Sequence, residues 1–89
     1  MKVSITELKI LIFIGIKGNK NLKSIGRFLS RKPLHTSPYL NRLRRNRMVV
    51  ITTEPSKTGR PKSLYNLSAK GLKFLQEFRD LLSVALETE

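Results

Sequence analysis

Hydrophobic positions near the N-terminus predict a first helix. The pair Ser4 and Glu7 has the Ser-x-x-Glu spacing of a capping box and stands directly before an apolar run over residues 8–16. Gly15 and Gly18 are candidate stops for the helix, and Gly18 is the better placed, as the residue after the C-cap. The run is apolar nearly all round, whereas a surface helix keeps one polar face, so we expect burial on two sides.

Two shorter helices are predicted next. Apolar residues at helical spacing indicate a helix over residues 22–29. A basic segment over 30–35 forms the turn after it. A third helix is expected to begin near Thr36 or Ser37, whose hydroxyls can cap it, and to end at about Arg47.

The remaining pattern predicts a hairpin and a last helix. Residues 48–53 are rich in β-branched side chains and read as a strand, followed by a turn-rich basic loop over 54–62 and a second strand over 63–67. Ser68 can cap a helix that reaches about Leu86. The predicted fold class is α+β, mostly α.

The excess of basic residues narrows the class of partner that the protein can bind. The chain has 18 Lys and Arg against 6 Asp and Glu, a net charge of +12. Residues 1–76 hold 17 bases and two acids, while residues 77–89 hold one base and four acids. A surface with this imbalance favours a polyanionic partner, nucleic acid before an anionic membrane.

Several kinds of chemistry are not predicted. Without Cys there is no disulfide and no thiolate site, and His35 is the single histidine, without partners for a metal site or a triad. No nucleophile constellation or phosphate loop is present, so we expect no enzyme, no cofactor, no metal and no small-molecule ligand. The apolar run over 8–16 is too short to span a bilayer, which predicts a cytoplasmic protein without a membrane partner.

Three stretches resemble the winged helix–turn–helix regulators of archaea and bacteria. They are residues 21–29, residues 39–49, and residues 58–71, where Gly-Arg-Pro and an aromatic strand lead into Leu-Ser-Ala-Lys-Gly. The resemblance implies a three-helix core with a hairpin wing over residues 1–67, and a C-terminal dimerisation helix over 68–89. Arg47 departs from the family, which often has Gly there. The Ile, Lys and Arg usage favours an archaeal or viral source, and host cytoplasm if viral.

The resemblance also implies a function, a transcription regulator that binds double-stranded DNA. Its third helix would enter the major groove, where Arg pairs with guanine and Asn with adenine. Residues of the second helix and the turn would contact phosphates. The predicted DNA contacts are Lys23, Arg27, Arg31, Lys32, Thr36, Ser37, Tyr39, Asn41, Arg42, Arg45, Lys57, Arg60 and Lys62.

The hairpin tip suggests a contact with the minor groove. Gly59-Arg60-Pro61, flanked by Lys57 and Lys62, looks like the core of an AT-hook. Such a motif lays an extended Arg into the narrow groove of A·T-rich DNA. The plain alternative is a solvated loop.

A wide apolar stripe on the last helix predicts a homodimer that binds an inverted repeat. Related regulators dimerise through this helix, and the acidic C-terminal segment would point away from DNA. The predicted interface residues are Leu11, Leu75, Phe78, Leu82 and Ala85.

Three other functions fit the sequence less well. The first is a basic RNA-binding or ribosome-associated winged helix, but only Tyr39 and Tyr65 could provide stacking aromatics. A winged helix that binds only protein is disfavoured by the basic charge of residues 1–76. Membrane association is disfavoured because no helix sets its bases opposite an exposed apolar stripe.

Overall fold

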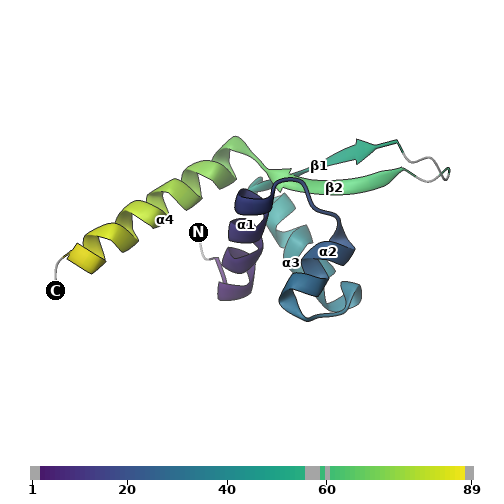
Figure 1. Cartoon of the computed structure of the whole chain (residues 1–89). Coiled ribbons are helices and arrows are strands. Elements are labelled where there is room, and N and C mark those ends of the chain that lie inside the picture. Colours follow the sequence, from purple (N-terminus) through teal and green to yellow (C-terminus); the bar gives the residue numbers. More distant parts are fainter. Residues whose placement is uncertain (1–2, 56–58, 60, 88–89) are drawn as a thin grey trace.

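A computed structural model describes residues 3–55, 59 and 61–87. Four helices and one antiparallel hairpin follow in the predicted order (Figure 1). The fold class predicted from the sequence, mostly α with one hairpin, is therefore confirmed. The elements are α1 (Ile5–Lys17), α2 (Leu22–Leu29), α3 (Pro33–Arg45), β1 (Val49–Glu54), β2 (Lys62–Leu67) and α4 (Ala69–Glu87).

The first three helices enclose the core with the base of the hairpin. Leu40 and Leu43 of α3 are fully buried. Leu11 is also fully buried, so its prediction as a dimer-interface residue is wrong, because its side chain fills the core of a single chain. The buried core consists of Ile10, Leu11, Ile14, Ile25, Leu40, Leu43, Met48 and Val49.

The ends of α1 follow the predicted capping. The Ser4 side chain accepts a hydrogen bond from the backbone N–H of Glu7, and the Glu7 carboxylate accepts one from Ser4. Gly18 ends the helix with a φ of 83°. Burial on two sides is not reached within one chain, because Ile16 stays 74% exposed.

The start of α3 differs from the prediction. The helix begins at Pro33, three residues before Thr36, and Lys32 is its N-cap. Proline suits the first helical position, where its fixed φ fits and its missing N–H has no helical partner. The turn between α2 and α3 is therefore the short segment 30–32, with Ser30 in the left-handed conformation (φ 56°). Pro38 consequently lies inside the helix.

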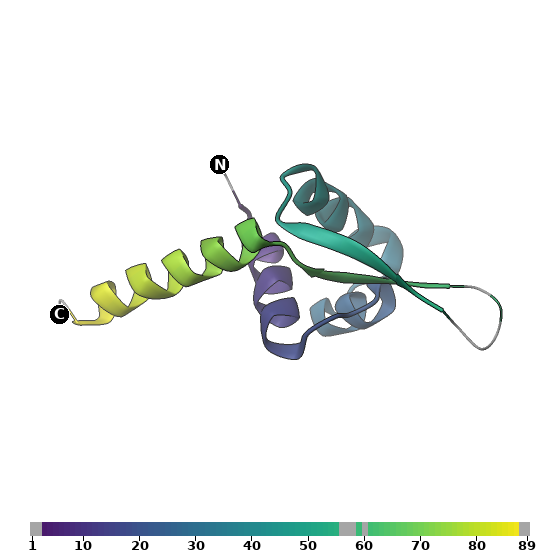
Figure 2. The same cartoon turned by 90° about the horizontal axis from the view of Figure 1, so that it is seen from above.

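The hairpin pairs from Val49 with Leu67 to Glu54 with Lys62, within one residue of the predicted strands. An unpredicted third segment joins it. Lys20 and Tyr65 exchange two backbone hydrogen bonds of 3.1 and 2.8 Å, which tie the connection between α1 and α2 to β2. These two bonds hold the connection between α1 and α2 against β2 (Figure 2).

Contacts at its first turn fix α4. The Ser68 hydroxyl accepts from the N–H of Gly71, as the predicted cap requires, and donates to the Arg47 carbonyl. Gly71 lies directly against the Met48 carbonyl oxygen. Farther along, α4 extends away from the other helices, giving a long shape of 54 × 24 × 22 Å (Figure 1). None of the helices in the described part is long and apolar enough to cross a membrane.

Candidate nucleic-acid interface

The outward face of α3 is polar and cationic. Asn41 and Arg45 are exposed on the side opposite the buried Leu40 and Leu43. Arg44, which the sequence analysis did not select, lines a shallow hollow with both of them. This face offers one amide and two guanidinium groups to a partner outside the chain.

Arg42 is on the same helix, but its guanidinium is already engaged. Its Nη1 lies 3.3 Å from Oε1 of Glu7, whose side chain is completely buried, while the Arg42 side chain is 59% exposed. Arg42 therefore neutralises a buried carboxylate and keeps other N–H groups toward solvent. This pair left no signal in the sequence, because 35 residues separate its members.

The turn between α2 and α3 adds more positive charge. Arg31 and Lys32 are both exposed. The Arg31 guanidinium lies 5.4 Å from the centroid of the Tyr39 ring and donates to its hydroxyl at 3.4 Å. Tyr39 thus positions a cation of the turn. Ser37, in the second turn of α3, is half-buried.

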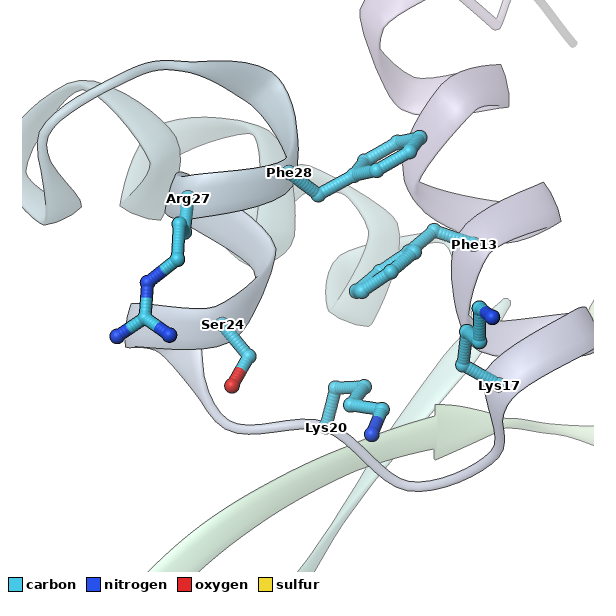
Figure 3. Close-up of a pocket in the computed structure, with 6 residues that line it drawn as sticks. All are labelled: Phe13, Lys17, Lys20, Ser24, Arg27 and Phe28. Carbon is cyan, nitrogen blue, oxygen red and sulfur yellow. The ribbon is translucent and has the colours of Figure 1, made fainter.

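Helix α2 presents Lys23 and Arg27 to solvent. Beside them, a hollow between α1 and α2 is lined by Lys17, Lys20, Ser24 and Arg27 around two phenylalanines (Figure 3). Phe13 and Phe28 are stacked there at 4.3 Å with an interplanar angle of 11°, and Phe28 remains 48% exposed.

Four other residues were predicted to contact DNA, and they do not share one outcome in the structure. Thr36 is fully buried and its hydroxyl donates to the Lys32 carbonyl at 3.1 Å, so it cannot contact DNA as expected. Lys62 is exposed at the start of β2, opposite Glu54. Lys57 and Arg60 lie outside the described residues.

One exposed apolar residue of α3 was also missed. Leu34, in the first turn, is 79% exposed. From the sequence, Leu34 was expected in the turn before the helix. The signal that could have found it is Pro33, a residue type favoured at the first helical position.

The electrostatics of this surface have one sign. No Asp or Glu occurs between Glu7 and Glu54, and Glu7 is buried under Arg42. The exposed parts of α2, α3 and the turn between them therefore carry no carboxylate that would repel a polyanion. In the part of the chain that the structure describes, no group of three His, Asp or Glu could hold a metal ion.

A second surface, between α1 and α4, is apolar. Leu75 is half-buried there, whereas Phe78 is 36% and Leu82 50% exposed. Ala85 is exposed one turn farther on. A groove of about 450 Å³ between the helices is lined mainly by apolar residues, with Gly15, Gln76 and Arg79 beside them. The apolar residues are Ile12, Ile16, Leu72, Leu75, Phe78 and Leu82.

Solved structures share this arrangement. RV1404 from Mycobacterium tuberculosis superposes with a TM-score of 0.83 at 18% identity, over 99% of this chain and 62% of that one. A transcriptional regulator homologue from Pyrococcus horikoshii gives 0.76 at 20% identity, over 91% and 79%. A MarR-like transcriptional regulator from Thermotoga maritima gives 0.71 at 24% identity, over 99% and 64%.

The chain thus spans less than two thirds of two of these structures. No protein-family model matches it, and neither does any curated protein sequence. The structural likeness establishes the fold, a winged helix–turn–helix in which α2 and α3 form the motif and the hairpin is the wing.

Proposed function

We propose that this winged-helix protein binds double-stranded DNA and regulates transcription. The observation that carries the proposal is the exposed face of α3, with Asn41, Arg44 and Arg45 beside a basic turn and no exposed carboxylate. A helix of this width fits the major groove, where Arg and Asn can read guanine and adenine edges.

Phosphate contacts would surround that helix. Lys23 and Arg27 extend from α2, while Arg31 and Lys32 extend from the turn, so cations flank the start of α3. Such contacts fix the register of a protein on the duplex and carry no base information. Arg60, which lies between β1 and β2 in the sequence, would enter the minor groove, where A·T-rich DNA has its strongest negative potential.

The protein would act as a homodimer on an inverted repeat. The apolar residues of α4 that extend past the core, with the groove against α1, form a surface that a second copy can cover. A two-fold axis through this surface would pair two recognition helices on successive turns of one duplex face.

Selection of bound duplexes from a random pool tests the proposal. We expect enrichment of an inverted repeat with half-sites about one helical turn apart. Binding without any sequence enrichment would argue for a non-specific architectural role, and absence of binding to duplex DNA would overturn the proposal.

RNA binding is the second candidate, and one observation favours it. The exposed Phe28, stacked on Phe13 and bordered by Lys17, Lys20 and Arg27, is an aromatic surface beside cations of the kind that receives unstacked bases. A parallel selection from a single-stranded RNA pool distinguishes the two. Stronger enrichment there, lost in Phe28→Ala, would replace the DNA proposal.

A further inference from the structure

The first turn of α3 carries an unusual side chain for a helix proposed to face DNA. Leu34, the second residue of the helix, is 79% exposed, more than any other large apolar residue in the described part of the chain. It does not belong to the apolar surface of α1 and α4. Its neighbours Arg31 and Lys32 are exposed cations, which favour a polyanionic partner for this end of the helix.

Leu34 is the first member of a row along α3. Spacings of four, three and four residues place Leu34, Pro38, Asn41 and Arg45 on one line of the helix surface, and all four are exposed. The line runs opposite the buried Leu40 and Leu43 and therefore forms the middle of the outward face. Its chemistry changes from apolar at the start to an amide and then a guanidinium.

We propose that Leu34 and Pro38 form an apolar surface that reads the 5-methyl groups of thymines in the major groove. This inference rests on the proposed DNA binding and adds to it the base that the start of α3 prefers. The thymine methyl is the one apolar group on the major-groove edge of the bases, and the N-terminal residues of a recognition helix are those that contact base edges.

The order of residues along the row also orders the bases. Eleven residues separate Leu34 from Arg45, which corresponds to roughly 16 Å along a helix. This length covers about five base pairs at 3.4 Å each, when the helix follows the groove. A half-site would therefore have thymine at the end under Leu34, and adenine or guanine toward Asn41 and Arg45.

The test replaces single thymines of the selected site with deoxyuridine, which removes the methyl group and leaves the hydrogen-bonding edge unchanged. For the wild-type protein we expect a loss of about fourfold in affinity at one or two thymines per half-site, the factor for burying one methyl group. Leu34→Ala should bind the unmodified site more weakly and should no longer distinguish thymine from deoxyuridine at the position that Leu34 contacts, while a thymine under Pro38 keeps its penalty. Leu34→Met should retain the distinction.

The outcomes of this test distinguish the reading of thymine methyl groups from the proposed DNA binding on which it rests. If wild type binds its site and tolerates deoxyuridine everywhere, Leu34 does not read methyl groups. The inference is also overturned if Leu34→Ala keeps the full wild-type penalty at each deoxyuridine. Lack of specific binding to any duplex would instead overturn the proposed function itself.

Discussion

Arg42 of α3 and Glu7 of α1 form an ion pair in which only the carboxylate is buried. Nη1 of Arg42 lies 3.3 Å from Oε1 of Glu7, and Oε2 of Glu7 has no hydrogen-bond partner. The same carboxylate caps α1 through the N–H of Ser4. One buried charge thus joins the start of α1 to α3, and Arg42 has a structural role within the chain itself.

The first prediction concerns the stability of this pair. Arg42→Ala leaves the Glu7 carboxylate buried without its cation, so we expect a loss of about 1–3 kcal/mol in the free energy of unfolding. Glu7→Gln, which removes the charge and keeps the capping oxygen, should cost less than Arg42→Ala. Urea denaturation measures both. Arg44→Ala, an exposed Arg of the same helix, is the control, and equal losses for Arg42→Ala and Arg44→Ala would contradict the prediction.

Arg47 carries a second prediction about stability. Its φ is 60°, a left-handed conformation that non-glycine residues adopt at a cost. Its N–H still donates to the Arg44 carbonyl, and this bond survives any substitution except proline. Arg47→Gly should therefore stabilise the protein by about 0.5–1 kcal/mol. Arg44→Gly, within the helix, should destabilise it by a similar amount. A lower melting temperature for Arg47→Gly would refute the argument.

Gly71 gives the third prediction. A Cβ at this position would lie 2.1 Å from the carbonyl oxygen of Met48, a backbone atom that cannot turn aside. Gly71→Ala should destabilise the protein by about 1–3 kcal/mol, because α4 must move away from the core. Gly15→Ala is the matched control. Its Cβ would meet only the ends of Leu75 and Leu67 side chains, at 3.1 and 3.3 Å, and Ala favours the helix. Thermal melts of equal midpoint for the two variants would count against the close contact.

The start or end of a helix could be predicted from the sequence where a single local signal determines it. The Ser4 and Glu7 capping box predicted the start of α1 to the residue, and Ser68 predicted the start of α4. Gly18 predicted the end of α1 to within one residue, because it is the C-cap and not the residue after it. The start of α3 was missed because Thr36 also has the chemistry of a cap. Packing decided otherwise, since Thr36 is buried and a proline occupies the first helical position.

Site residues were harder to predict because exposure depends on contacts far apart in the chain. The pattern of α1 could not separate Leu11, which fills the core, from Ile16, which is exposed beside α4. Both are apolar residues of one helix, and only the packing of other elements distinguishes them. The link of Lys20 to Tyr65 was missed for the same reason, because a single bridge leaves no periodic signal.

The fourth prediction separates base contacts from phosphate contacts. Arg45→Ala should weaken binding to the selected site by about 1–3 kcal/mol and relax the preference at one base pair. Lys23→Ala should weaken selected and random duplexes alike and reduce the slope of log affinity against log salt by about 1. Titrations of both duplexes at several salt concentrations measure these effects. If Arg45→Ala lost affinity equally on both duplexes, Arg45 would be a phosphate contact.

The last prediction concerns the dimer. Beyond the residues that pack on the core, α4 continues with Phe78 at 36%, Leu82 at 50% and Leu81 at 70% exposure. Two copies that join these surfaces would bury the apolar side chains. The same arrangement would keep the four acidic residues of the segment 77–89 away from the phosphates. The expected separation of the recognition helices is roughly 34 Å, one turn of the duplex.

Leu82→Glu places a charge in the middle of that surface. The variant should therefore sediment as a monomer of 10.2 kDa at micromolar concentration, under conditions where we expect the wild type to sediment as a dimer. Its affinity for the inverted repeat should fall steeply, because the second half-site is no longer engaged at high effective concentration. Its affinity for an isolated half-site should change little, which distinguishes lost pairing from lost folding. Ser83→Glu introduces the same charge at an exposed position about 100° away around the helix and should remain dimeric. A wild type that sediments as a monomer, or a Leu82→Glu variant that binds the repeat as tightly as wild type, would exclude the dimer.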